Sequence, residues 1–179
     1  MEADRAEAAP RVELRPVEPA DDEFLLDVYA SSRADEMALV DWTDEQKRAF
    51  LRSQLDAQRA DYEGRFPRAD YDVIVVGGRP AGRLWVARKP DEIHLIDIAL
   101  LPEFQNRGVG KFLLGRLIEE SEAKGLPLRH TVYFYNPQAR RFYERLGFTK
   151  CGEAMGGAYI HMERLPASRG GVSPPAARG

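Results

Sequence analysis

One strand–loop–helix segment constrains the fold more than any other part of the chain. Residues 93–101 read IHLIDIALL, an almost continuous apolar run that predicts a central strand. After a short loop, Gly108 and Gly110 open a helix with apolar residues at helical spacing: Val109, Phe112, Leu113 and Leu117. The first amides of a helix lack intrahelical acceptors and carry partial positive charge, and glycines let a phosphate approach them. The segment therefore predicts an anion site, to which Arg107 and Lys111 add charge.

Three phosphate-binding motifs can be compared with this segment. A Walker loop, G-x-x-x-x-G-K-[ST], does not fit, because Gln105 occupies its first glycine position and Phe112 follows the lysine. The dinucleotide fingerprint G-x-G-x-x-G does not fit either, because Leu113 stands where the third glycine belongs. Residues 105–110, QNRGVG, are instead similar to the Q/R-x-x-G-x-G/A signature of the GNAT acetyltransferases. The alternative is that the glycines form only a tight turn.

A second segment resembles the same family. Residues 136–148 read NPQARRFYERLGF and match the family's N-x-x-A-x-x-x-Y-x-x-x-G-F pattern. Taken alone, this segment predicts a helix in which Asn136 is the N-cap, Pro137 takes the first helical position and Gly147 ends the helix. The resemblance covers about residues 11–165 and is strongest over 93–148.

The resemblance implies an α/β (α+β) fold of the GNAT type. Such a fold is a mixed, mostly antiparallel central sheet of about seven strands, flanked by about four helices, with splayed fourth and fifth strands. The patterns along the chain agree: strands are expected over 12–17, 71–76, 82–88, 93–101, 128–135, 148–152 and 158–164, and helices begin near residues 21, 43, 108 and 137. We expect one domain over 11–165, with disordered tails at 1–10 and 166–179, where apolar residues are scarce.

Local signals predict where several elements begin. Asp21 is expected to cap the first helix, and residues 43–46, TDEQ, fit a capping box that opens the second. The second helix is expected to turn three apolar residues inward: Phe50, Leu51 and Leu55. The two glycines at 77–78 predict the turn of a hairpin.

The resemblance also implies a cofactor site and a reaction. Acetyl-CoA would be the co-substrate, and its acetyl group would pass directly to an amine without a covalent enzyme intermediate. The backbones of Ile98, Ala99 and Leu100 would bond the pantetheine arm, and one of their amides would polarise the thioester carbonyl. The pyrophosphate would be held by the signature loop: Gln105, Asn106, Arg107, Gly108, Val109, Gly110 and Lys111.

Two residues of the second segment would complete that site. Asn136 would bond the pantetheine, a role compatible with its being an N-cap. Tyr143 would act as the general acid that protonates the departing CoA thiolate. The alternative for Tyr143 is a packing role, because it lies on the apolar face of its helix. The alternative for Arg107 and Lys111 is that they are solvated surface charges.

The general base is less well indicated, although an ammonium acceptor must lose a proton before it attacks. Many relatives use an acidic residue on the fourth or fifth strand. On the fifth, Thr131 and Tyr133 stand where a glutamate would be sought. On the fourth, Asp97 is a carboxylate among apolar neighbours, and His94 is of a type that titrates near neutral pH. A structural role is the alternative for both, and solvent could take the proton.

The acceptor site of the family is built by the first two helices, the loop between them and the last strands. That loop, residues 31–42, reads SSRADEMALVDW. Met37, Leu39 and Trp42 could form the wall of a pocket. Glu36 and Asp41 could receive a cation. The alternative is a loop that packs on the core through Trp42. A small-molecule amine and a peptide or protein amine remain open as acceptors.

Composition excludes several other classes of protein. The formal net charge is −3 and no dense Lys/Arg stripe occurs, so nothing points to nucleic acid. No apolar run reaches the roughly 20 residues that a membrane helix needs, and the first residues do not resemble a signal peptide, so a cytoplasmic location is expected. His130 and His161 are expected to be strand residues, with no metal site, and Cys151 to be a buried small side chain. A homodimer is compatible with the resemblance.

Three functions remain open at this level. The first is an N-acetyltransferase. The second is a non-catalytic acyl-CoA-binding or regulatory module with the same fold, for which the absent fifth-strand glutamate leaves room. The third is an enzyme for a longer acyl group, which small residues near Ala99 would admit.

Overall fold

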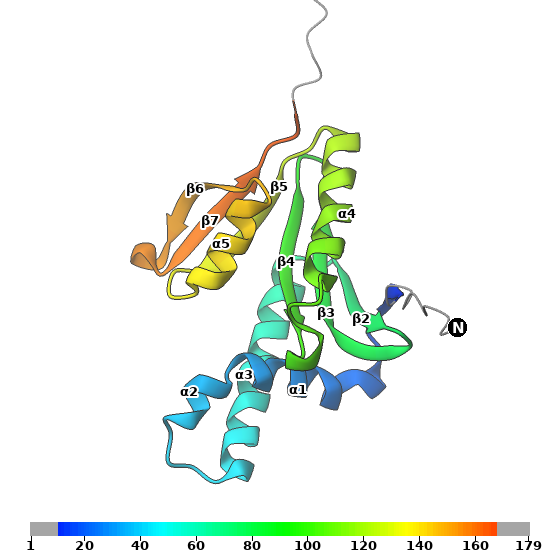
Figure 1. Ribbon diagram of the computed structural model, residues 1–179. Coiled ribbons are helices and arrows are strands. Elements are labelled where there is room, and N and C mark those ends of the chain that lie inside the picture. Colours follow the sequence, from blue (N-terminus) through cyan, green and yellow to red (C-terminus); the bar gives the residue numbers. More distant parts are fainter. Residues whose placement is uncertain (1–10, 168–179) are drawn as a thin grey trace, which may run out of the picture. The chain divides into compact units, whose positions relative to one another are not determined.

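A computed structural model describes residues 11–167, so most of the predicted tails lies outside the described residues. The described chain forms two compact units, one of residues 11–89 with 94–115 and one of residues 90–93 with 116–167. Their elements are shown in Figure 1 and are, in order, β1 (Val12–Pro16), η1 (Pro19–Asp21), α1 (Asp22–Ser32), α2 (Ala34–Ala38), α3 (Asp44–Arg65), β2 (Asp70–Val76), β3 (Arg79–Arg88), β4 (Ile93–Leu100), η2 (Pro102–Phe104), α4 (Val109–Lys124), β5 (Leu128–Tyr133), α5 (Pro137–Arg145), β6 (Thr149–Ala154), η3 (Met155–Gly157) and β7 (Tyr159–Arg164).

The first unit contains four strands in the order β1-β2-β3-β4. β1 pairs antiparallel with β2, and β2 with β3 across a two-residue turn. Gly77 and Gly78 form that turn with φ angles of 56° and 81°. Two consecutive positive φ angles match the right-handed twist of the strands and favour glycine. The hairpin predicted from the two glycines is therefore confirmed.

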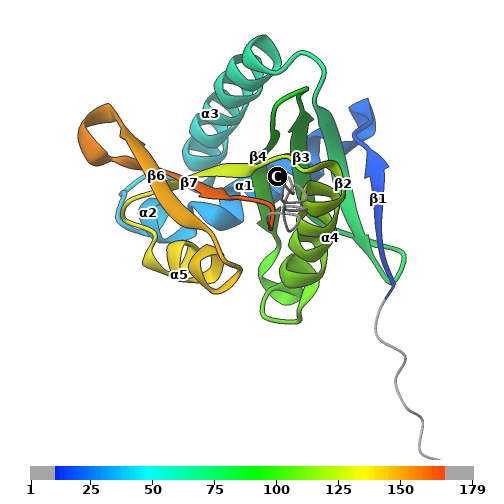
Figure 2. The ribbon, with the colours of Figure 1, turned by 90° about the horizontal axis from the view of Figure 1, so that it is seen from above.

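Helices cover both faces of this part of the sheet. Figure 2 shows α1 and α3 on one face of β2–β4 and the start of α4 on the opposite face. The α1–α3 side is held by a cluster of buried side chains: Leu25, Leu26, Tyr29, Leu51 and Leu55. Burying one such side chain contributes about 1.5–3 kcal/mol, so this cluster holds α1 and α3 together.

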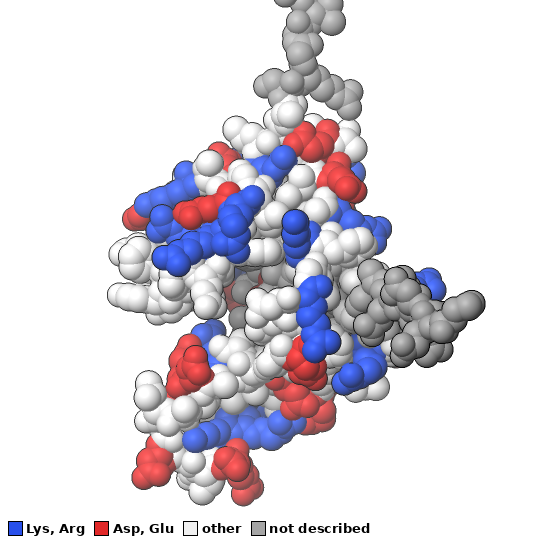
Figure 3. Space-filling model, in the orientation of Figure 1, with Lys and Arg blue, Asp and Glu red and all other residues white. Residues whose placement is uncertain are grey.

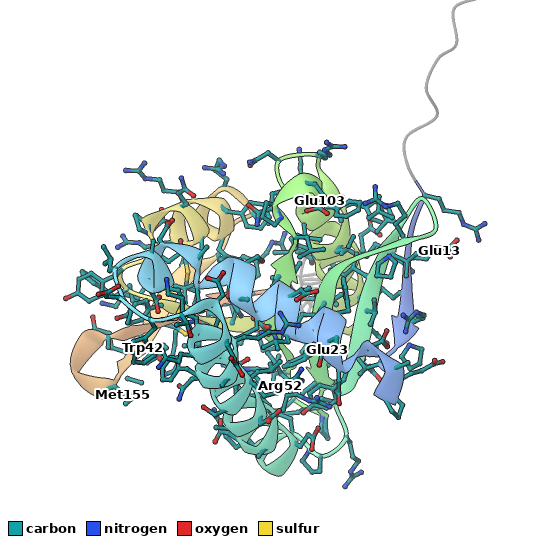
Figure 4. All side chains as sticks on the ribbon, turned by 90° about the horizontal axis from the view of Figure 1, so that it is seen from below. Glu13, Glu23, Trp42, Arg52, Glu103 and Met155 are labelled. Carbon is teal, nitrogen blue, oxygen red and sulfur yellow. The ribbon has the colours of Figure 1, made fainter. Side chains whose placement is uncertain are left out.

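The capping box that opens α3 is confirmed. Thr43 Oγ1 accepts from the Gln46 amide at 3.2 Å, and the Gln46 side chain accepts from the Thr43 amide at 2.9 Å. Farther along, ion pairs link α3 to α1: Arg48 Nη1 lies 2.9 Å from Asp27 Oδ1, and both Arg48 and Arg52 contact Glu23. Figure 4 shows Glu23 and Arg52 facing each other from the two helices. Exposed pairs of this kind are worth little each, so packing dominates.

The second unit contains the strands β5-β7-β6 and the helix α5. β7 pairs antiparallel with both neighbours, with Thr131 opposite His161 on β5 and Gly152 opposite His161 on β6. The β6–β7 register shifts between Lys150 and Gly152. Figure 1 shows α5 beside these strands, and Tyr143 of α5 contacts β5 through His130.

Several local predictions were wrong. Phe50 was expected inward but is 38% exposed, and Phe112, one of the apolar residues noted at helical spacing, is 49% exposed. Phe50 packs edge-on against Trp42 at 5.4 Å instead. The buried stripe of α4 includes Val109 and Leu113, and at 100° per residue Phe112 points away from it.

Two further predictions fail for reasons of tertiary pairing. Asp21 precedes α1 but makes no side-chain cap there, because its carboxylate accepts two hydrogen bonds of 2.7 Å from Arg15 and one of 2.8 Å from the Glu18 amide. Cys151 is exposed, since it falls where the β6–β7 register shifts. The region between the first two predicted helices, expected to be a loop, contains the short helix α2.

Candidate functional site

Near its carboxyl end, β4 is approached closely by Gly82 of β3. A Cβ placed on Gly82 would lie 2.1 Å from Ala99 O and 2.9 Å from Leu100 Cα, so only glycine fits at this position. The Leu101 amide then donates to Ala81 O at 2.9 Å. Gly82 thus sets the path of the strand end that contains the half-buried residues Ile98, Ala99 and Leu100.

The loop after β4 is held to the strand by its own side chain. Gln105 Nε2 donates to Leu100 O at 2.8 Å, which ties the first residue of the signature to the strand end. Asn106 and Gly108 then adopt left-handed backbone with φ angles of 56° and 81°. Asn and Gly tolerate this region best among the natural residues, which explains these residue types here.

The left-handed turns lead directly into α4. The Phe112 amide donates to Gly108 O at 2.9 Å and begins the intrahelical hydrogen bonds. The preceding amides of the helix have no intrahelical acceptor and carry the positive end of its dipole. Arg107 and Lys111, which flank the start of the helix in the sequence, have exposed side chains. Backbone donors, glycines and two cations thus come together as the sequence predicted, an arrangement suited to a phosphate or pyrophosphate.

Asp97, one of the two base candidates, is bound to a buried arginine. Its Oδ2 accepts from Arg83 Nε at 2.6 Å, and the Arg83 and Asp97 side chains are 3% and 24% exposed. Arg83 Nη2 donates to Gln58 Oε1 at 3.1 Å, and the guanidinium lies 4.3 Å from the centre of the Trp85 ring. Burial, together with the nearby charge of Asp97, raises the pKa of Tyr62 to about 12. Asp97 thus belongs to a polar cluster between β3, β4 and α3.

His94, the other base candidate, is half-buried on the same strand. Its ring stacks on Phe66, with centroids 5.1 Å apart and planes inclined by 25°. The role of Asp97 or His94 as a base stays a prediction.

The expected acceptor loop has two kinds of residue. Met37 packs against the core cluster of α1 and α3, and Glu36 pairs with Arg33 at 3.0 Å. Asp41 and Trp42 are exposed, and Figure 4 shows Trp42 at the turn before α3. Of these four residues, Met37 is thus turned towards the core, whereas Glu36, Asp41 and Trp42 are exposed.

In the second unit, Asn136 and Tyr143 have the local roles that the sequence predicted. Asn136 Oδ1 accepts from the Ala139 amide at 3.0 Å, which confirms the N-cap. Tyr143 is 3% exposed and packs between His130 and Phe148, with ring centroids 4.6 Å and 5.4 Å away. Figure 3 shows Lys and Arg side chains gathered over α5 and the start of β6, where four basic residues are exposed: Arg140, Arg141 and Arg145 on α5 and Lys150 on β6.

Sequence reasoning missed a pair of side chains on β5 and β7. Thr131 Oγ1 and His161 Nδ1 lie 2.9 Å apart, and the neighbouring rings of Tyr133 and Tyr159 have centroids 5.5 Å apart. These partners are about 30 positions apart along the chain, so only the strand register reveals them. Over residues 11–167, no group of three His, Cys, Asp or Glu side chains could hold a metal, and no helix is long and apolar enough to cross a membrane.

Comparison with known proteins agrees with the two sequence motifs. The family model described as "Acetyltransferase (GNAT) family" matches residues 30–148. A [ribosomal protein bS18]-alanine N-acetyltransferase of Haemophilus influenzae is 40% identical over 60 residues, which cover 34% of this chain and 41% of the relative. A 5-NmdU N-acetyltransferase of Pseudomonas phage PaMx11 is 37% identical over 70 residues, covering 39% and 48%. The chain thus spans less than half the length of the curated relatives it matches.

Solved structures share the fold. PaiA N-acetyltransferase from Thermoplasma acidophilum, solved with coenzyme A, superposes with a TM-score of 0.61 at 19% identity over 87% of this chain and 99% of that one. The ribosomal-protein-S18-alanine N-acetyltransferase of Escherichia coli superposes with a TM-score of 0.57 at 23% identity over 92% and 99%. The fold class expected from the sequence is therefore confirmed.

Proposed function

Because the chain belongs to the acetyltransferase (GNAT) family, we propose that it is an N-acetyltransferase that moves an acetyl group directly from acetyl-CoA to a primary amine. The observation that carries the proposal is the loop from Gln105 to Lys111. It joins left-handed turns at Asn106 and Gly108 to the free amides of α4. Such a loop accepts a diphosphate, and the diphosphate is the most strongly charged part of CoA.

The residues present fit the acyl donor in each unit. In the first unit, the signature loop would hold the pyrophosphate, and the backbone of Ile98–Leu100 would bond the pantetheine arm. In the second unit, Asn136 would bond the same arm and Tyr143 would stand near the sulfur. The thioester supplies an activated acetyl group, and no metal is needed for its transfer to an amine.

The chemistry that the chain's own residues supply is donation of hydrogen bonds and protons. A backbone amide near Ala99 would stabilise negative charge on the carbonyl oxygen as the amine attacks. The new nitrogen–carbon bond forms while the carbon–sulfur bond breaks. The Tyr143 hydroxyl would give its proton to the leaving thiolate, and solvent would return a proton to the phenol.

The acceptor is proposed only by class. A relative that acetylates an alanine of a ribosomal protein supports a peptide or protein amine. A relative named as a 5-NmdU N-acetyltransferase leaves an amine of another kind open. We therefore place the acceptor among primary amines and leave its size to the experiment. The alternative function is an acyl-CoA-binding module with the same fold that has no catalytic activity.

A thermal-shift titration with acetyl-CoA tests the cofactor site, with Gly108→Glu as the variant and Gly78→Glu as its matched control. Both glycines have a φ of 81° and open space where a Cβ would lie, so the backbone strain is alike. A ligand at a hundredfold excess over Kd stabilises the native state by roughly 2.7 kcal/mol. We expect this shift in wild type and in Gly78→Glu and its loss in Gly108→Glu. Equal shifts in the two variants would refute the assignment of the loop.

CoA release then separates an enzyme from a binding module. The wild-type protein is assayed with acetyl-CoA and a panel of amines: a peptide that begins with alanine, a lysine-containing peptide, a polyamine and an aminomethyl nucleoside. Amine-dependent CoA release with mass-spectrometric detection of the acetylated product supports the enzyme. A protein that binds acetyl-CoA and releases no CoA with any of them supports the module.

A further inference from the structure

The β5–β7 ladder brings a histidine and a threonine together. Thr131 and His161 are direct partners in the antiparallel register, and Thr131 Oγ1 lies 2.9 Å from His161 Nδ1. Both side chains are half-buried. Among residues 11–167, no hydrogen-bond partner lies at the other ring nitrogen of His161, Nε2. The imidazole is thus fixed at one nitrogen and available at the other.

The pair lies on the face of the strands opposite to α5. Side chains alternate along a strand, so Thr131 points away from its neighbours His130 and Val132. Those two are buried, and His130 contacts Tyr143 of α5 at 4.6 Å. The proposed acid, Tyr143, therefore packs against one face of β5, while the Thr131–His161 pair occupies the other.

The neighbours of His161 on the same face are a glycine, an aromatic pair and an ion pair. Gly152 is its partner on β6, and a Cβ there would already lie 3.4 Å from His161 Cδ2. Along the same face, Tyr133 and Tyr159 form an exposed ring pair on one side. On the other side, the charged groups Arg129 and Glu163 pair with each other at 3.2 Å. Aromatic faces attract ammonium groups, so the two tyrosines suit the approach of a cationic acceptor.

We propose that His161 is the general base of the acetyl transfer and that Thr131 is its positioning residue; this rests on the proposed function. The Thr131 hydroxyl accepts from Nδ1–H, which leaves Nε2 as the proton acceptor. Nε2 takes one proton from the acceptor ammonium, directly or through one water. The neutral amine then attacks the acetyl carbon, and its second proton leaves to solvent as the carbon–sulfur bond breaks. A histidine on β7 thus fills the role for which β5 offers no carboxylate.

The other base candidates are tied to neighbours that give them a structural role. Asp97 Oδ2 accepts from the buried Arg83, and His94 stacks on Phe66. His161 differs because its polar partner is a hydroxyl that can accept as well as donate. Imidazole also has an ordinary pKa near 6.5, so histidine as a residue type accepts protons at neutral pH.

The test compares His161→Gln with Asp97→Asn and His94→Gln in pH profiles of kcat/KM, using the amine that gives CoA release in wild type. We expect His161→Gln to lower kcat by about 10²- to 10³-fold and to remove the acidic limb of the profile, with the acetyl-CoA thermal shift unchanged. Thr131→Val is expected to lower kcat less, and Thr131→Ser to restore it. Histidine-selective 15N NMR should show Nε2 unprotonated in neutral His161, and Thr131→Val should abolish this preference.

Three other outcomes would each overturn a stated part of the proposal. Activity of His161→Gln within threefold of wild type, with the acidic limb retained, would overturn it while the proposed function stands. A neutral His161 protonated at Nε2 would overturn the positioning by Thr131. Wild-type protein that binds acetyl-CoA but acetylates no amine would remove the proposed function itself, and with it any need for a base.

Discussion

Asp97→Asn should destabilise the protein strongly, because it removes the charge that neutralises a buried guanidinium. Arg83 is 3% exposed, its Nε donates to Asp97 at 2.6 Å, and its Nη1 already has no partner among the described residues. Breaking a buried ion pair by removing one partner costs about 3–5 kcal/mol. Gln58 still accepts from Nη2, and Asp97 is 24% exposed, so the lower end, about 3 kcal/mol, applies.

Removing the other partner of the ion pair, Arg83, should lower the free energy of unfolding by less. Arg83→Met keeps most of the side-chain volume against Trp85 and leaves a carboxylate that water can reach, so we expect a loss of about 1 kcal/mol. The double variant Arg83→Met/Asp97→Asn should be more stable than Asp97→Asn alone. The double variant is expected to be the more stable because it no longer contains the buried guanidinium, whereas Asp97→Asn leaves that charge buried without a counter-ion.

Chemical denaturation followed by tryptophan fluorescence measures these differences, because Trp85 lies against the guanidinium. For a chain of this size, 3 kcal/mol corresponds to a fall in Tm of about 6–12 °C. The wild type and the three variants should share one m-value, so that midpoints report stability alone. A loss below about 1 kcal/mol in Asp97→Asn, or additive losses in the double variant, would refute the claim that the ion pair is buried and coupled.

Three further predictions test other parts of the molecule. Gly82→Ala should push β4 away from β3 at Ala99 and weaken the acetyl-CoA thermal shift. By contrast, Gly115→Ala, in open space on α4, should raise the free energy of unfolding by up to about 1 kcal/mol. An unchanged thermal shift in Gly82→Ala would contradict the close approach of the two strands. Hydrogen bonding from Arg15 holds the pKa of the Asp21 carboxyl below its usual range, so the stability that this pair contributes should be full above about pH 4 and lost as pH falls through the lowered pKa. The difference in unfolding free energy between wild type and Asp21→Asn should therefore close in acid. A difference independent of pH would count against the pair. Burial raises the pKa of Tyr62 to about 12, so stability should fall as pH rises from about 10 towards that value, and Tyr62→Phe should reduce this fall in denaturation measured at alkaline pH.

Local chemistry made much of the fold predictable. The N-cap at Asn136, the capping box at Thr43 and the glycine turn at 77–78 involve residues within four positions of one another. The signature loop is equally local, because a glycine, a helix start and two cations follow one another in the chain. For such features the sequence already contains all the interacting groups.

Tertiary structure decided which side chains meet across strands. Arg83 and Asp97 are 14 positions apart, and Thr131 and His161 are 30 apart. Asp21 was expected to cap a helix, and Arg15 on the neighbouring strand binds its carboxylate instead. A one-residue change of register would exchange the two faces of a strand, so no pattern within a single segment specifies these partners.

The sequence by itself thus determined the family signature, the helix starts and the approximate positions of the strands, because these depend on backbone conformation and on neighbours along the chain. The tertiary structure decided the exposure of Phe50, Phe112 and Cys151, the anchoring of Asp97 and the pairing of His161. The physical reason is that burial and pairing depend on how strands align, and alignment is settled by the packing of the whole sheet and its helices.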